Sequence, residues 1–145
     1  LEVPTGGDSW VDGNFNWTQV CHAGLVVGAL AVADEEPALA RRIVARAVGS
    51  LDPVGATYAP DGSYAEGPSY WSYGTTFHVL LIEALRGALG TSAGLERYPG
   101  FLASAGYKAQ MLAPSGDEYN YSDHHVENVN EPVLLWYARE LRDRH

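Results

Sequence analysis

Apolar residues recur along this chain with the three-and-four spacing of helices, and no stretch sustains the alternation of apolar and polar residues typical of strands. The first such stretch, 16–33, is longer than an ordinary strand, and its second half is apolar on all sides, which is typical of a buried helix. The same spacing predicts four further helices, at 37–49, 69–89, 101–112 and 133–142. The chain is therefore predicted to be all-α, built of antiparallel helical hairpins.

Glycines and loops divide these helices. The short turn after the first helix predicts a hairpin, in which Gly24 and Gly28 would allow a neighbouring helix to come close, and Gly90 is expected to end the third helix. The connections at 51–68 and 113–130 are long for a compact domain. Loops of such length more often carry function than not, so these two loops are the first candidates for a functional site.

The composition and the net charge of the chain exclude several classes of function. The 145 residues are 46% hydrophobic and 19% charged, which is enough apolar content for a folded core. Asp and Glu number 18 against 9 Lys and Arg, and the formal net charge of -9 argues against binding to nucleic-acid phosphates. No apolar run is long enough to span a bilayer. The lone cysteine, Cys21, excludes an internal disulfide and is expected to lie inert in the core.

Three polar residues interrupt the apolar first helix. Asn16, Gln19 and His22 are spaced by three, so they form a slowly rotating polar stripe on one side of the helix. One interpretation is structural, with Asn16 as the N-cap and the other two as hydrogen-bonded core residues. The alternative is that the stripe lines a cavity at the helix N-terminus, where an anionic ligand would be favoured.

The loop before the third helix and the first turn of that helix are rich in aromatic residues, namely Tyr58, Tyr64, Tyr70, Trp71 and Tyr73. Aromatic faces beside hydroxyls and carboxylates suit sugar rings, although the same cluster could simply attach the loop to the helices. Asp61 is expected to serve the Pro-Asp-Gly turn. Glu66 could bind a ligand or accept backbone N–H bonds within the loop.

The run Asp123-His124-His125 in the second long loop invites a metal hypothesis. Adjacent residues chelate one ion poorly, and no further His or Cys cluster follows nearby, so no metal site is predicted. A loop that lines a cleft is the favoured interpretation.

Three blocks of the sequence together resemble the heparinase II/III-like polysaccharide lyases. They are Asn16-Trp17-x-x-Val20-Cys21-x-x-Gly24, Pro60-Asp61-Gly62-x-Tyr64-x-Glu66-Gly67-Pro68-x-Tyr70-Trp71-x-Tyr73-Gly74 and Asn120-Tyr121-Ser122-Asp123. The resemblance covers about 16–136, and its Glu-Gly-Pro-x-Tyr block is the most specific part. It implies part of an (α/α) toroid catalytic domain, with further helices and a downstream β-sandwich domain expected elsewhere in the same polypeptide.

The resemblance also implies a reaction, which is β-elimination on a polysaccharide containing uronic acid. Asn16 would bind the uronate carboxyl group, Tyr70 would be the acid and could also be the base, and the base in relatives is often a histidine. Some relatives carry that histidine directly after the asparagine, where this chain has Trp17, so His22 and His124 are the local candidates. The expected substrate-binding residues are Gln19, Tyr64, Glu66, Trp71, Tyr73 and His124.

Further expectations follow from the resemblance. No cofactor is implied, the partner is an anionic polysaccharide or oligosaccharide such as heparin, heparan sulfate or alginate, and the location is periplasmic or secreted. The net charge of -9 opposes the approach of an anionic polymer, so positive charge in the cleft or elsewhere in the polypeptide is expected. Two other functions remain open, namely a toroidal glycoside hydrolase that uses Asp61, Glu66 or Asp123 as a carboxylate pair, and a helical carbohydrate-binding module without catalysis.

Overall fold

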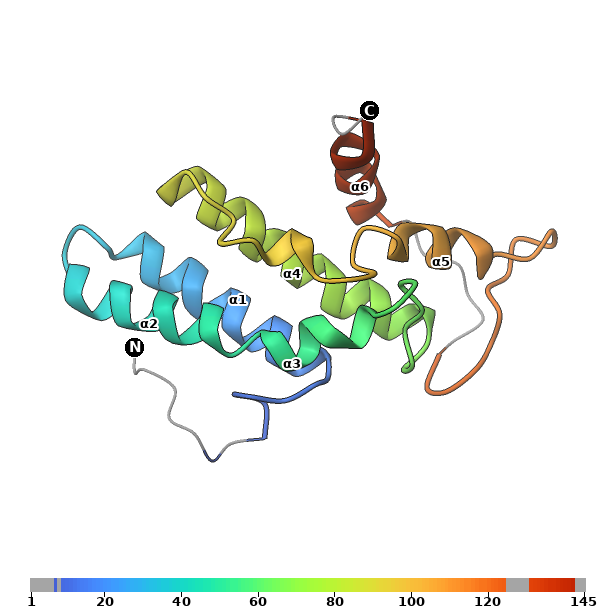
Figure 1. Ribbon diagram of the computed structural model, residues 1–145, viewed down its shortest axis with the longest axis horizontal. Coiled ribbons are helices and arrows are strands. Elements are labelled where there is room, and N and C mark those ends of the chain that lie inside the picture. The colour runs from blue at the N-terminus through green and yellow to red at the C-terminus, as the bar shows by residue number, and fades with distance from the viewer. Residues whose placement is uncertain (1–6, 8, 125–130, 143–145) are drawn as a thin grey trace.

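The computed structural model describes residues 7, 9–124 and 131–142, and within them the protein is helical with no strand (Figure 1). The only sheet-like pairing in that part of the chain is an isolated bridge between Leu112 and Glu118. The helices are α1 (Asn16–Ala31), α2 (Pro37–Gly49), α3 (Asp52–Gly55), α4 (Pro68–Leu89), α5 (Ser104–Gln110) and α6 (Val133–Arg142), with two short 3-10 turns, η1 (Ala56–Tyr58) and η2 (Leu95–Arg97). The prediction of an all-α fold is confirmed.

Four of the five predicted helices match the structure within about two residues, and the fifth is shorter. The helix predicted at 101–112 covers only Ser104–Gln110, because Phe101 is anchored in the core as part of a turn that precedes it. The long loop predicted at 51–68 contains α3 and η1. Gly90 ends α4 as expected, with the left-handed backbone conformation (φ 69°) that glycine adopts easily.

Three long helices form the framework that positions the candidate site. α1 and α2 run in opposite directions as a hairpin, and α4 runs in the same direction as α1 (Figure 1). α1 packs most extensively against α4 and next against α2. The N-terminal ends of α1 and α4 therefore lie at the same end of the molecule.

An aromatic cluster fills the space between α4, α6 and the loop before α5. Phe101 is fully buried at its centre, 5.0 Å from the Tyr58 ring and 5.6 Å from the Tyr137 ring between centroids. His78 of α4 is also fully buried, with its ring centroid 4.8 Å from that of Phe101, and burial lowers the pKa of His78 to about 4. His78 is therefore a neutral core residue at physiological pH.

An apolar surface remains exposed on α1 and α4. Trp17 and Val27 of α1 are 59% and 48% exposed, and Tyr73 and Leu80 of α4 are 42% and 51% exposed. The expectation that α1 is buried on all sides is wrong, because α2 and α4 cover two of its sides and leave a third open. Cys21, expected in the core, is only half-buried. Within the described residues, no helix combines the length and the hydropathy needed to cross a bilayer.

α1 and α4 are tightly packed at Gly74. A Cβ atom at this position would lie 2.3 Å from Gln19 Oε1, 3.1 Å from Asn16 Cβ and 3.3 Å from the Tyr64 hydroxyl. Only a residue without a side chain allows the first turns of the two helices to meet in this way. Gly24, by contrast, is exposed, and a Cβ atom at its position would meet no atom within 4 Å, so the close approach predicted for it is not found there.

We expect Gly74→Ala to destabilise the protein by about 1–3 kcal/mol, because Gln19 must move out of its hydrogen-bonded position. Alanine has the better helix propensity, so the measured loss contains a compensating gain of up to about 1 kcal/mol. Gly87→Ala, at an exposed position of the same helix with nothing within 4 Å, is the matched control and should gain about 0.5–1 kcal/mol. Urea unfolding followed by circular dichroism measures both. Equal stabilisation by the two variants would contradict the close contact.

Candidate functional site

The candidate site begins at the first residue of α1. Asn16 is buried, and its Nδ2 donates a hydrogen bond to Glu66 Oε2 at 2.8 Å, across fifty positions of sequence. Phe15, not Asn16, occupies the N-cap position, and no side chain caps the helix. The capping interpretation of Asn16 is therefore wrong, because its side chain is committed to Glu66. Its other polar atom, Oδ1, is buried without a hydrogen-bond partner.

A chain of buried hydrogen bonds continues from Gln19. Gln19 Nε2 donates to the Tyr58 hydroxyl at 2.9 Å, and that hydroxyl lies 2.8 Å from Thr75 Oγ1. Burial raises the pKa of Tyr58 to about 12, so the hydroxyl keeps its proton at neutral pH, and either hydroxyl can be the donor in the bond between Tyr58 and Thr75. Gln19 Oε1 is left buried without a partner beside Gly74. These hydrogen bonds hold the Gln19 side chain one helical turn after Asn16.

Tyr64 is the next polar group of the cluster. It is only 3% exposed, and its hydroxyl lies close to Gly74 without a hydrogen bond of good geometry. Burial, with smaller effects of Tyr58 and the nearby Glu66 carboxylate, raises the pKa of Tyr64 well above its usual range. Tyr64 is therefore a protonated hydroxyl at any physiological pH.

An open pocket of about 260 Å³ lies in front of this cluster, lined by Asn14, Phe15, Thr57, Tyr64, Ala65 and Glu66. Of the predicted site residues, Tyr64 and Glu66 line the pocket directly, and Asn16 lies behind Glu66. Glu66 is the only charged residue among the lining residues. The pocket thus presents a carboxylate, an aromatic ring and an amide at the N-terminal end of α1.

Tyr70 lies in the first turn of α4, outside the lining of this pocket. It is half-buried and packs against the main core, one helical turn before Gly74 on the same side of α4. Its backbone is therefore on the side of α4 that meets the start of α1. Tyr73 is 42% exposed and makes an edge-to-face contact with Phe77, with ring centroids 5.5 Å apart.

Two predicted site residues are buried away from the pocket. His22 is fully buried, and its Nε2 lies 2.8 Å from the Val11 carbonyl oxygen. Burial lowers the pKa of His22, so the neutral ring donates Nε2–H to that carbonyl. The Trp71 indole is also fully buried and packs against Tyr137 at 6.0 Å between ring centroids. Neither side chain reaches the pocket surface in this structure.

A second buried polar cluster surrounds the start of α4. Lys108 Nζ lies 2.7 Å from Glu118 Oε1 and 3.1 Å from Glu131 Oε1, and the Lys108 and Glu118 side chains are only 4% and 3% exposed. Glu131 in turn accepts a hydrogen bond from Ser72 of α4. A buried lysine held by two carboxylates thus ties α5 and the start of α6 to the first turn of α4.

His124 belongs to the same cluster. The Ser69 backbone N–H donates to His124 Nδ1 at 3.1 Å, and the Ser69 hydroxyl also contacts Nδ1. Nδ1 is therefore an acceptor, so the ring proton of the neutral form is on Nε2, which faces Glu118 Oε2 at 3.3 Å. His124 thus contacts Ser69, the residue next to Tyr70.

Of the three carboxylates of the hydrolase alternative, only Glu66 lines the pocket. Asp61 is exposed and accepts the Ser63 backbone N–H at 3.0 Å, which is the turn role predicted for it, and this bond lowers the pKa of Asp61. Asp123 is also exposed. The metal hypothesis cannot be followed in full, since His125 lies outside the described residues. Among the residues that are described, no three His, Cys, Asp or Glu side chains are grouped to hold an ion.

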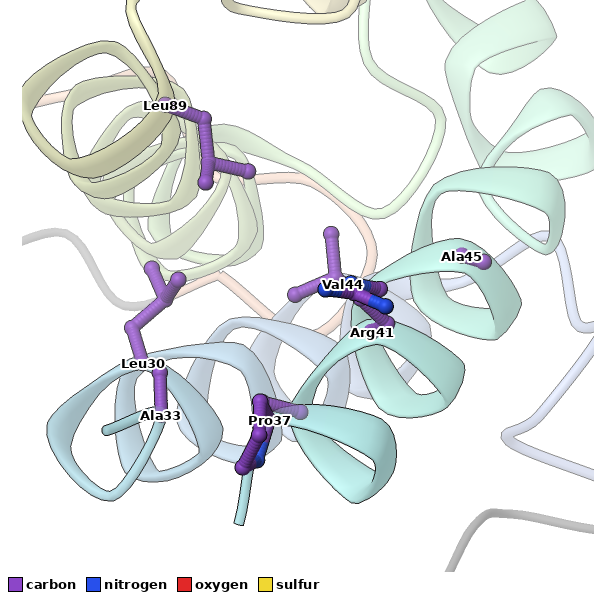
Figure 2. A pocket seen from close by; sticks show the side chains of 8 residues that line it. Leu30, Ala33, Pro37, Arg41, Val44, Ala45 and Leu89 are labelled. Atoms are coloured by element: carbon purple, nitrogen blue, oxygen red, sulfur yellow. The ribbon is translucent and has the colours of Figure 1, made fainter. Parts of the chain in front are cut away.

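A second cavity lies at the opposite end of α1. This groove of about 300 Å³ is lined almost entirely by apolar side chains of α1, α2 and the end of α4, namely Leu30, Ala33, Pro37, Ala40, Arg41, Val44, Ala45 and Leu89 (Figure 2). Arg41 is its only polar side chain. The groove holds no pair of groups that could transfer a proton, so the pocket beside Glu66 is the better candidate for chemistry.

In the comparisons with known proteins, no protein-family model and no curated protein matches the chain. The function proposed for this chain therefore rests on the residues described above.

We expect Lys108→Met to lower the free energy of unfolding by about 3–5 kcal/mol, because it leaves the buried Glu118 and the nearby Glu131 without their cation. Arg97→Met is the control, since the Arg97 side chain is 80% exposed, and it should change stability by less than about 0.5 kcal/mol. Chemical denaturation with an unchanged m-value measures both variants. A loss below about 1 kcal/mol for Lys108→Met would contradict a stabilising role of this size for the lysine.

Proposed function

We propose that this chain is part of the α/α toroid of a heparinase II/III-like lyase that cleaves a uronic-acid-containing polysaccharide by β-elimination. The observation that carries the proposal is the hydrogen bond between Asn16 and Glu66. It joins two of the three sequence blocks that carry the resemblance, and Glu66 lines a pocket. The packing of Gln19 on Gly74 brings the same two blocks together a second time.

The arrangement of the long helices supports the toroidal part of the proposal. A toroid of helical hairpins repeats a unit in which one helix leaves, a second returns, and the next hairpin begins parallel to the first helix. α1, α2 and α4 follow this order, with α4 parallel to α1 (Figure 1). The exposed apolar side of α1 and α4 is the side on which further helices of such a ring would pack.

Elimination makes two chemical demands. The proton on C5 of a uronate becomes acidic only when the carboxyl group is neutralised or hydrogen-bonded, and the leaving oxygen on C4 needs a proton. We assign the first task to the Asn16 amide and the second to Tyr70, because a tyrosine side chain in water loses its proton only near pH ~10 and can serve as an acid at neutral pH. His22 donates to the Val11 carbonyl and His124 Nδ1 accepts the Ser69 N–H, so both rings are engaged within the fold. We therefore assign the base to Tyr70 itself or to a histidine elsewhere in the polypeptide.

The lyase proposal also includes the class of substrate and the location of the enzyme. A uronic-acid polysaccharide is an extracellular or cell-wall polymer, which agrees with a periplasmic or secreted enzyme. The reaction needs no cofactor, because the electrons of the broken C5–H bond form the new double bond. The non-catalytic alternative, a carbohydrate-binding module, would keep the pocket but not the dependence on Tyr70.

Tyr70→Phe removes the transferable proton and keeps the ring, so we expect turnover of a uronate polymer to fall by about 10²–10⁴-fold with little change in stability. The assay is the ultraviolet absorbance of the unsaturated uronate product, measured over a panel of uronic-acid polysaccharides. Tyr73→Phe is the matched control in the same motif and should have a far smaller effect. A large loss with Tyr73→Phe and none with Tyr70→Phe would mean that the wrong tyrosine is assigned. Full activity of both variants would end the lyase proposal.

Ionic strength gives a second prediction. With a net charge of -9, the protein repels an anionic polymer at long range, so we expect kcat/KM to rise several-fold as salt increases from about 0.01 M to about 0.15 M. The reason is that the Debye length falls from about 30 Å to about 8 Å over this interval. kcat at saturating substrate should stay constant and serves as the internal control. A fall of kcat/KM over the same interval would show that local positive charge governs the encounter.

A further inference from the structure

We propose that Glu66 is a specificity-determining residue, which makes the pocket accept sugar units that carry a carboxyl group but no sulfate. This inference rests on the proposed lyase function and adds the substrate class. It names unsulfated polyuronates, or unsulfated stretches of a glycosaminoglycan, as the polymer that the pocket binds.

The first argument is the position of the Glu66 carboxylate. Glu66 Oε2 accepts the Asn16 Nδ2 proton at 2.8 Å, so it occupies the donor that the uronate carboxyl group would use. A substrate carboxyl group must share this amide with Glu66 or displace it. In either case one substrate acid comes within close range of a protein carboxylate at the pocket surface.

The second argument is the distribution of positive charge. Within the described residues, no lysine or arginine lines the pocket. Lys108 is buried with Glu118 and Glu131, Arg86 pairs with Glu83 and Glu140, and Arg46 pairs with Asp12. Arg41 lines the apolar groove at the other end of α1. The pocket therefore offers this substrate a negative group and neutral donors.

The different acid strengths of a carboxyl group and a sulfate ester determine which of them can lie beside Glu66. Two carboxyl groups in contact can share one proton, because the repulsion raises one of the two pKa values until that group is neutral. A sulfate ester is a strong acid that stays ionised at any physiological pH, so it keeps its full repulsion against Glu66. A carboxyl group can thus enter beside Glu66, whereas a sulfate on the same sugar cannot do so without a compensating cation.

The test compares heparan sulfate with its chemically desulfated form, which shares its backbone, using the native protein and Glu66→Gln. The native protein should cleave the desulfated polymer at least about tenfold more efficiently in kcat/KM. Glu66→Gln keeps the size of the side chain and an oxygen that can accept the Asn16 proton, but removes the charge. It should reduce this ratio by at least about fivefold, chiefly through a lower KM for the sulfated polymer.

Glu35→Gln is the control, because Glu35 is exposed on the turn after α1 and its replacement changes the net charge by the same amount. It should leave the ratio unchanged. Affinities of both polymers for the Tyr70→Phe protein, with and without Glu66→Gln, measure the same selectivity without turnover. Thermal unfolding of each variant confirms that it is folded.

The remaining outcomes distinguish a failure of the proposed selectivity from a failure of the proposed lyase function. Equal cleavage of the two polymers by the native protein would overturn the selectivity and leave the lyase function intact. Loss of activity of Glu66→Gln on the desulfated polymer would show that Glu66 takes part in the reaction and would overturn its role as a charge selector. If neither polymer, nor any unsulfated polyuronate, is bound or cleaved, the proposed function fails, and the inference fails with it.

Discussion

The contact of Gln19 with Gly74 determines how the rest of the structure is arranged. A side chain at Gly74 would collide with the Gln19 side-chain oxygen, so glycine is needed where the N-terminal parts of α1 and α4 meet. Gln19 is held there by Tyr58, which links the 3-10 turn η1 to the same place. The Asn16–Glu66 bond follows from this contact, because both residues belong to segments that it fixes.

The first turn of α4 is held from two sides by different kinds of force. On one side, Gly74 packs against Gln19 of α1, and Glu66, just before α4, accepts a hydrogen bond from Asn16. On the other, a buried lysine and its carboxylates attach α5 and the start of α6 through Ser69, Ser72 and His124. A buried ion cluster tolerates little displacement, because every unpaired charge costs several kcal/mol. Tyr70, which lies between Ser69 and Ser72, is consequently on a turn that is held by contacts on both sides.

The helices were predictable from sequence because each long one has a local apolar period and a local end signal, such as Gly90 for α4. The polar stripe at Asn16 and Gln19 was also visible, since it breaks an apolar run. Their pairing with Glu66 and Gly74 was not, because these partners lie fifty or more positions away, although Glu66 itself was a candidate site residue. Lys108, Glu118 and Glu131 were missed for another reason, because they look like ordinary surface charges until the fold buries them together.

The exposed apolar side of α1 and α4 has a consequence for the behaviour of the protein in solution. Apolar surface in water favours association by about 25 cal/mol for each Å² that becomes covered, whatever the covering molecule is. Mutual repulsion between like-charged copies opposes this association, and the net charge of -9 supplies it near neutral pH. That repulsion vanishes near the isoelectric point of about 4.8. The acidic composition that hinders the approach of an anionic polymer thus also acts as the colloidal stabiliser of a molecule with an uncovered helical face.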